Sequence, residues 1–209
     1  MTGTATVHLV DDDESYLKAT ARMLTLEGFQ VATFASGRRL MVAVTPSARG
    51  CIVADLSMPE LDGLQLQAML AAEGVHMPLV FLSGHGDIPS TVRAMQGGAV
   101  DFLEKHAPRE RLVAAIRRGL ERDASEHEEH ARLADLKRRF GTLSKRELEV
   151  LREVLRGQLN KQVAATLGIS ERTVKLHRRS IKSKVGAHTA ARLAALARDA
   201  GLSDERPAP

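Results

Sequence analysis

The chain has 209 residues, of which 44% are hydrophobic and 27% charged, a composition typical of a soluble globular protein rather than a disordered one. Its single cysteine, Cys51, excludes an intrachain disulfide and a cysteine-based zinc site. We expect a cytoplasmic protein without a signal peptide or a membrane span. The N-terminus lacks a basic segment followed by an apolar one, and no apolar run approaches ~18 residues.

The formal net charge of +4 is distributed unevenly along the chain. Residues 1–110 carry 8 basic and 13 acidic side chains, whereas residues 111–209 carry 22 and 13. Most of the excess lies in residues 140–209, which hold 14 basic and 7 acidic side chains. Chance surface charge is one explanation. The other is a pair of domains with different partners, of which the basic one would bind nucleic acid.

The first half of the chain alternates short apolar runs with amphipathic segments. This pattern predicts strands at residues 6–10, 30–34, 51–54, 79–82 and 99–103. It predicts helices at residues 14–27, 37–44, 64–72 and 88–96, and a fifth helix that begins at Pro108. Five strand–helix pairs in succession favour an α/β fold, (βα)5, with a doubly wound parallel sheet and helices on both faces.

Residues 119–139 are highly charged, contain few turn-forming residues and carry a thin apolar stripe at helical spacing. We expect a helical linker there, which either continues the fifth helix or pairs with a second copy as a short coiled coil.

The last part of the chain follows an all-helical pattern with four short helices. Ser144 and Glu147 form a capping box before the first of these helices. The next three helices have capping residues at Asn160, Ser170 and Thr189. Residues 203–209 are predicted to be disordered. We therefore divide the chain into an α/β domain (1–121), a linker (122–141) and a small all-α domain with its tail (142–209).

Polar and charged side chains stand at the carboxyl ends of the predicted strands, where doubly wound folds bind their ligands. Asp11 and Asp12 follow the first strand, and Asp55 follows the third. Ser83 follows the fourth strand, and Lys105 lies just past the fifth. Clustered carboxylates repel one another unless a cation neutralises them, and a hard ion such as Mg²⁺ suits oxygen ligands. A carboxylate in this position can act as a nucleophile toward a phosphoryl donor.

Four sequence blocks resemble the signature of receiver domains of two-component response regulators, in the right order and at the right spacing over residues 5–121. The blocks are Val10–Asp13, Ala54–Gly63, Phe81–Asp87 and Gly98–Lys105. Taken singly, each polar residue in these blocks more commonly lies in a solvated loop or turn, caps a helix or carries a surface charge. Taken together, the four blocks favour a phosphorylation site.

The resemblance implies a role for each matching residue. Asp55 would be the phosphoacceptor, and a sensor histidine kinase would be the phosphodonor. Ser83 would hydrogen-bond the acyl phosphate, and Lys105 would pair with it. Phe102 stands at the position of the rotameric aromatic switch of the family, which works together with Ser83.

The resemblance also implies a metal site. Asp11 and Asp12 would hold Mg²⁺ together with Asp55, and the backbone carbonyl of Ser57 would be a further ligand. Competing enzyme classes lack their motifs, since neither a G-x-G-x-x-G after the first strand nor a Walker A motif is present. The haloacid-dehalogenase phosphatases need a second aspartate two residues after the nucleophile, where Ser57 stands here.

One position departs from the family. His106 follows Lys105 where the family usually has proline, often after a cis bond. A cis bond before a non-proline residue costs ~2.5–4 kcal/mol, so the loop either retains that strain or is rebuilt with a trans bond. His85 fits a loop into the next helix, capped by Asp87, and is also a candidate for tuning the access of water to the phosphate.

The C-terminal helices resemble the LuxR-type helix-turn-helix over residues 142–200. The matching segments are Leu143–Leu151, Gly157, Asn160–Ala164, Leu167–His177 and Ile181–Val185. An acidic first domain and a basic second one resemble regulators of the FixJ/NarL group. The resemblance implies that Lys175, Leu176 and Arg179 lie in the major groove of duplex DNA, and that Asn160 and Lys161 contact its backbone.

The helix predicted at residues 171–185 supports this assignment independently, because it is amphipathic and basic. Val174, Ile181 and Val185 share one face, and the cations lie on the other. Such a helix fits the major groove and would bind with a steep salt dependence. A solvated basic face is the alternative, and His177 is as suited to helix packing as to contact. The full set of expected DNA contacts is Asn160, Lys161, Arg172, Lys175, Leu176, Arg178, Arg179 and Lys182.

We therefore predict a transcription regulator that is switched by phosphorylation and catalyses only its own phosphotransfer and autodephosphorylation. The active form would dimerise on duplex DNA, and RNA polymerase is a candidate further partner. One alternative is a phosphate-independent DNA-binding dimer whose altered Lys105–His106 loop mutes switching. Another is a phosphate sink, which the basic C-terminal domain disfavours.

Overall fold

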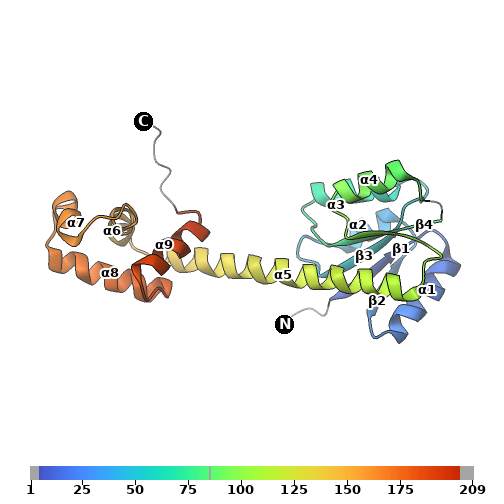
Figure 1. Ribbon diagram of the computed structural model, residues 1–209, viewed down its shortest axis with the longest axis horizontal. Helices are drawn as coiled ribbons and strands as arrows, with labels where there is room; N and C mark the ends of the chain where they lie inside the picture. The colour runs from blue at the N-terminus through green and yellow to red at the C-terminus, as the bar shows by residue number, and fades with distance from the viewer. Residues whose placement is uncertain (1–4, 85, 203–209) are drawn as a thin grey trace. The chain divides into compact units, whose positions relative to one another are not determined.

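The computed structural model describes residues 5–84 and 86–202 (Figure 1). The predictions for His85 and for residues 203–209 fall outside the described residues. The chain divides into two compact units, Met1–His127 and Glu128–Pro209. Among the described residues, every helix is too short or too polar to cross a bilayer.

The first unit is built on a five-stranded parallel sheet. Its strands are β1 (Thr6–Val10), β2 (Gln30–Phe34), β3 (Gly50–Asp55), β4 (Leu79–Ser83) and β5 (Asp101–Glu104). Their order is β2-β1-β3-β4-β5, and all neighbouring strands run parallel. β3 and β4 are buried along their whole length, which explains why their sequences are almost uninterrupted apolar runs. The prediction of a doubly wound parallel sheet is confirmed.

Helices cover both faces of the sheet (Figure 1). One face carries α1 (Glu14–Leu26) and the first turns of α5 (Arg109–Gly141). The other carries α2 (Gly37–Ala43), α3 (Gly63–Ala72) and α4 (Ile88–Gln96). Side chains along β1 point alternately to the two faces of the sheet and so contribute to both cores. Val7 and Leu9 pack with α1 and α5, whereas Val10 packs with the other three helices.

Local hydrogen bonds set the limits of these elements. The side chain of Asp87 accepts from the N–H of Ser90 at 2.7 Å, so its predicted role as the N-cap of α4 is confirmed. The prediction that the fifth strand begins at residue 99 is wrong by two residues. The N–H of Ala99 donates to the carbonyl of Ala94 at 3.1 Å and thereby closes the end of α4, so the strand starts at Asp101.

The predicted linker continues the fifth helix, because α5 is one uninterrupted helix of 33 residues. Its early turns belong to the core of the first unit, where Gly119 lies against Cys51. A Cβ atom at Gly119 would stand 2.6 Å from the Cys51 sulfur, so only glycine permits this packing. Farther along, Asp123 is 7% exposed and accepts a hydrogen bond from the guanidinium of Arg49 at 2.8 Å.

The second unit contains the last turns of α5 and four short helices. These are α6 (Lys145–Leu155), α7 (Asn160–Leu167), α8 (Glu171–Val185) and α9 (Ala190–Asp199). Their apolar faces form one core, which includes Phe140 from α5 and Ile181 from α8. The predicted caps Ser144, Ser170 and Thr189 each accept a backbone N–H in the first turn of their helix.

The predicted capping role of Asn160 is wrong. Asn160 is already the first helical residue of α7, and Leu159 occupies the cap position. A leucine side chain cannot accept the free N–H groups of the first turn. Instead, the amide oxygen of Gln162 reaches back to accept the N–H of Leu159 at 2.8 Å. The Asn160 side chain is thereby left for another partner.

Candidate functional site

Three aspartates meet at the carboxyl end of the sheet. Asp11 follows β1 and is fully buried, and Asp55 ends β3 and is 4% exposed. Asp12 is exposed. Each of the three offers a carboxylate oxygen, and these oxygens lie within 4.8 Å of one another. Asp13 faces elsewhere and caps α1 by accepting the N–H groups of Ser15 and Tyr16.

Lys105 brings a cation into this cluster. Its backbone N–H donates to the carbonyl of Ser83 at 2.8 Å, which fixes the chain just past β5. Its ammonium nitrogen lies 2.7 Å from Oδ2 of Asp11 and 3.1 Å from Oδ2 of Asp55. Every peptide bond among the described residues is trans. The bond between Lys105 and His106 is therefore trans, and the loop does not retain the cis geometry that the family often has before proline.

Burial and charge act against each other in this cluster. Burial raises the pKa of Asp11, and its hydrogen bonds from Lys105 and the Asp13 N–H offset only part of that rise. Burial also acts to lower the pKa of Lys105, but its hydrogen bonds to Asp11 and Asp55 outweigh that effect and the pKa is raised. The lysine therefore stays charged beside the carboxylates of Asp11 and Asp55, and a bound cation would stabilise the cluster of three aspartates further.

At the carboxyl end of the sheet, two buried polar atoms have neither a hydrogen-bond partner nor an ion-pair partner among the described residues. They are Oδ1 of Asp55 and the hydroxyl oxygen of Ser83, which is fully buried at the end of β4. An unpartnered buried acceptor or hydroxyl is unfavourable, so both atoms favour a ligand that supplies the missing contacts. A hard cation on the carboxylate and a phosphoryl oxygen on the hydroxyl fit these two atoms.

The other predicted residues lie around this centre. Ser57 is exposed two residues past β3 and lines a polar pocket of about 540 Å³ together with Asp62 and Asp87. Phe102 is half-buried on β5, and its ring centroid is 6.2 Å from that of Phe81 on β4.

Gly63, the first residue of α3, allows the chain to pass close behind Asp55. A Cβ atom there would stand 2.7 Å from the Asp55 carbonyl oxygen and 2.7 Å from the Phe81 ring. We expect Gly63→Ala to lower the free energy of unfolding by about 1–3 kcal/mol, because the backbone that carries Asp55 must shift. Urea unfolding measures this change. Gly84→Ala is the matched control, because a Cβ atom at Gly84 meets nothing within 4 Å. Equal stabilities of the two variants would contradict the packing argument.

In the second unit, α8 presents a basic face to solvent. Arg172, Lys175, Leu176 and Arg179 are exposed, and Leu176 is 61% accessible despite its apolar side chain. Val174, Ile181 and Val185 are buried, as the helical spacing predicts. Lys161 at the start of α7 is also exposed, whereas His177 and Lys182 are half-buried.

Asn160 and Arg178, both predicted to contact DNA, bind each other. A guanidinium nitrogen of Arg178 donates to the side-chain oxygen of Asn160 at 2.9 Å and so joins α7 to α8. Arg178 is half-buried, which leaves it less accessible than Lys175 or Arg179.

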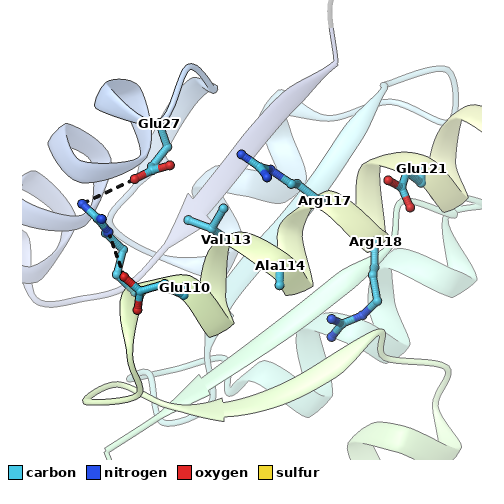
Figure 2. Close-up of a pocket in the computed structure, with 8 residues that line it drawn as sticks. Glu27, Glu110, Val113, Ala114, Arg117, Arg118 and Glu121 are labelled. Atoms are coloured by element: carbon cyan, nitrogen blue, oxygen red, sulfur yellow. Dashed lines mark ion pairs between the residues drawn. The ribbon is translucent and has the colours of Figure 1, made fainter.

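A further pocket of about 450 Å³ lies along α5 and the end of α1 (Figure 2). Its charges are largely paired within the protein, because Arg109 lies 3.4 Å from Glu27 and 3.6 Å from Glu110 (Figure 2). Arg118 on its rim pairs with Asp101 at 2.6 Å. The lining residues that the structure describes all lie outside the predicted sites.

Two family models match the chain. The response regulator receiver domain matches residues 7–117, and the luxR family of bacterial regulatory proteins matches residues 141–197. The chain is a two-component response regulator. It joins a receiver domain to a LuxR-type helix-turn-helix and is a transcription regulator rather than a conventional enzyme. The resemblance found in the sequence is confirmed.

Relatives match almost the whole length of this response regulator. Nodulation protein W of Bradyrhizobium diazoefficiens is 41% identical over 199 residues, which span 95% of this chain and 88% of the relative. Transcriptional regulatory protein FixJ of Azorhizobium caulinodans is 38% identical over 197 residues, which span 94% and 93%. The solved structure of the response regulator StyR is 39% identical, spans 94% of this chain and 99% of its own, and has a TM-score of 0.86.

Family membership indicates the general function of the acidic cluster and of the basic face of α8. A receiver domain implies a histidine kinase as partner, and its cluster of Asp11, Asp12 and Asp55 is typical of a metal-binding phosphorylation site. A LuxR-type domain implies binding to DNA.

Sequence reasoning recognised Glu147 only as half of a capping box, but the structure gives it a second role. Its carboxylate accepts from the Ser144 N–H at 2.7 Å, the Ser180 hydroxyl at 2.6 Å and the Lys184 ammonium at 2.7 Å. Glu147 is 4% exposed and therefore joins α6 to α8 inside the LuxR-type domain. The hydrogen bonds from Lys184 and Ser180 lower the pKa of Glu147 to about 2.

We expect Glu147→Gln to destabilise the LuxR-type domain by about 2 kcal/mol, because it removes charge-assisted hydrogen bonds from a buried site. Since folding lowers the pKa from its ordinary value of 4.5, the stabilisation is fully present above pH 4.5 and is lost as the pH falls toward 2. Thermal unfolding between pH 7 and pH 3 measures both effects. Glu149→Gln, on the same helix, breaks a pair with Arg146 whose Glu149 side chain is 44% exposed, and should change stability by less than ~0.5 kcal/mol. A Glu147→Gln variant with wild-type stability at pH 7 would refute the assignment.

Proposed function

We propose that a sensor histidine kinase phosphorylates Asp55 and that this phosphorylation controls sequence-specific binding to duplex DNA. The observation that supports this most directly is the buried Asp55 carboxylate, with Oδ2 held 3.1 Å from Lys105 and Oδ1 unpartnered among the described residues. A carboxylate in this state is available as a nucleophile, and its neighbours can carry negative charge.

The proposed step is an in-line transfer of a phosphoryl group. One oxygen of Asp55 forms a bond to phosphorus while the bond from phosphorus to the histidine nitrogen of the kinase breaks, and its electron pair stays on that nitrogen. The Lys105 ammonium pairs with the phosphoryl oxygens, and the Ser83 hydroxyl donates to one of them. Lys105 lies 3.1 Å from Asp55, and Ser83 ends β4, the strand that pairs with β3, so both groups lie at the same edge of the sheet as the nucleophile.

The same site would hold Mg²⁺. Asp11, Asp12 and Asp55 would supply carboxylate oxygens, and the backbone carbonyl of Ser57 would be a further ligand. When bound, the ion neutralises negative charge on the phosphoryl oxygens and on the clustered carboxylates.

We propose that phosphorylation shifts an equilibrium between two receiver conformations in the cytoplasm. Ser83 would follow the phosphoryl group, and Phe102 on the adjacent β5 would change its rotamer. The active form would dimerise and place two α8 helices on a two-fold-related DNA site, where RNA polymerase is a candidate further partner. The proposed functional division keeps the receiver at residues 1–121, the linker at 122–141 and the DNA-binding domain with its tail at 142–209.

In the DNA complex, α8 would enter the major groove. Lys175, Leu176 and Arg179 are exposed on one side of the helix and would face base edges. The remaining contacts would be made with phosphates, by Asn160, Lys161, Arg172, Arg178 and Lys182. The bond between Arg178 and Asn160 would let these two residues bind one phosphate together.

Labelling with a small phosphodonor tests the phosphorylation site. Incubation with acetyl phosphate should add one phosphoryl group per chain, only when Mg²⁺ is present, on the peptide that contains Asp55. Labelling that is independent of Mg²⁺ or that maps to another peptide would overturn the proposal.

A second candidate is a DNA-binding dimer that ignores phosphorylation. It is favoured by His106, which stands where the family usually has proline, is exposed, and pairs with Glu104 at 2.8 Å. This candidate predicts the same DNA affinity with and without the phosphodonor.

A further inference from the structure

Tyr16 contacts Lys105 at two points although the two residues are 89 positions apart. The centre of the Tyr16 ring lies 4.8 Å from the Lys105 ammonium nitrogen. The Tyr16 hydroxyl donates a long hydrogen bond of 3.5 Å to the Lys105 carbonyl oxygen. We propose that Tyr16 is a positioning residue that holds Lys105 for phosphoryl transfer, an inference that rests on the proposed phosphorylation of Asp55.

The loop that supplies the carboxylates also places Tyr16. The N–H of Asp13 donates to Oδ1 of Asp11 at 2.9 Å. The Asp13 side chain in turn accepts the N–H groups of Ser15 at 2.8 Å and Tyr16 at 3.1 Å. Tyr16 therefore lies in the first turn of α1, and its side chain is half-buried and close to the acidic cluster.

Lys105 needs such a support because its side chain has four flexible carbons. The carboxylates of Asp11 and Asp55 bind its ammonium on one side, and the Tyr16 ring lies over it within the ~6 Å range of a cation–π contact. The only other side-chain pair described in this loop joins His106 to Glu104, and both of these side chains are more than half exposed. An exposed pair of this kind contributes little to the loop geometry.

The chemical consequence is confined to the transfer step. With acetyl phosphate as donor, an oxygen of Asp55 forms a bond to phosphorus while the bond from phosphorus to the acetate oxygen breaks, and acetate leaves with the electron pair. Lys105 compensates charge on the transferring group, so its misplacement slows the step without preventing it.

The first test measures the rate constant for phosphorylation by acetyl phosphate in saturating Mg²⁺. We expect Tyr16→Leu to slow phosphorylation about fivefold, because the ring no longer confines the ammonium. Tyr16→Phe keeps the ring and should stay within about twofold of the wild type. Phe29→Leu, which removes another half-buried aromatic ring from the same core, is the control and should also stay within about twofold. A Tyr16→Leu variant with the wild-type rate would overturn the proposal.

The second test separates positioning from a general structural effect. In a Lys105→Ala background, Tyr16→Leu should change the rate less than about twofold, since the group that it positions is gone. The same fivefold loss in both backgrounds would overturn the proposal. A readout without phosphorylation is the urea midpoint of the Mg²⁺-free protein, in which the two substitutions should be non-additive; strict additivity would also overturn it. Asp55→Asn is carried in parallel, because labelling that survives in this variant refutes the proposed function itself.

Discussion

Asp55→Asn should reduce phosphorylation by acetyl phosphate at least ~100-fold, to the level of background labelling. Asparagine keeps the size of the side chain but replaces the anionic nucleophile with a neutral amide. Folding should survive, because the substitution removes one of three mutually repelling carboxylates that meet at the strand ends. The measurement is the stoichiometry of labelling by intact mass in the presence of Mg²⁺.

Asp62→Asn is the matched control for this experiment. Asp62 lies close by in sequence and caps α3, where asparagine is an equally good cap. We expect this variant to be labelled at the wild-type rate. If the control lost labelling and Asp55→Asn retained it, the nucleophile would have to be sought elsewhere in the receiver domain.

Lys175→Ala combined with Arg179→Ala should remove most of the sequence discrimination of the LuxR-type domain. A base contact of this kind contributes ~1–3 kcal/mol, so the loss of two should lower the ratio of specific to non-specific binding ~100-fold. Both side chains are exposed on α8, so the double substitution should leave the core of the second unit intact. Binding is measured on a duplex selected from a random library and on a scrambled duplex, at one fixed salt concentration.

Arg198→Ala controls for the loss of positive charge. Arg198 is exposed on α9 rather than on α8, so its removal should weaken binding to both duplexes by a similar small factor. A double variant that still discriminates between the duplexes as the wild type does would show that α8 is not the reading helix.

Much of the fold follows from local sequence signals. β3 and β4 are almost uninterrupted apolar runs because both of their faces are buried, and such runs are readily recognised. Caps such as Ser144 and Asp87 act within three residues, so their hydrogen bonds could be predicted from spacing alone. The start of β5 was harder to place, because Ala99 closes the preceding helix although its sequence continues an apolar run.

The position of each functional residue along the strands was predictable, but its partners were not. Parallel topology brings Asp11, Asp55 and Lys105 to one edge of the sheet, which the order of the elements indicates. Tyr16 and Glu147 show what is missing from such reasoning. Tyr16 fits the helical spacing of α1, and Glu147 fits a capping box. Their second roles depend on contacts with Lys105 and Lys184, which are 89 and 37 positions away.

Asn160 illustrates how tertiary contacts override a local preference. Asparagine is among the best capping residues, which favours the cap position. In the structure its side chain instead accepts from Arg178 on α8, and Gln162 closes the start of α7. The Asn160 side chain therefore joins α7 to α8 instead of capping α7.

The measurement that tests the account most directly is the affinity of the full chain for its selected duplex, with and without acetyl phosphate and Mg²⁺. We expect the phosphodonor to raise the affinity of the wild type at least ~10-fold and to leave Asp55→Asn unchanged at the basal value, because only the wild type can shift toward the active receiver conformation. Equal affinity of the wild type in both conditions, with labelling of Asp55 verified on the same sample, would contradict the switch and leave the phosphate-independent dimer as the explanation.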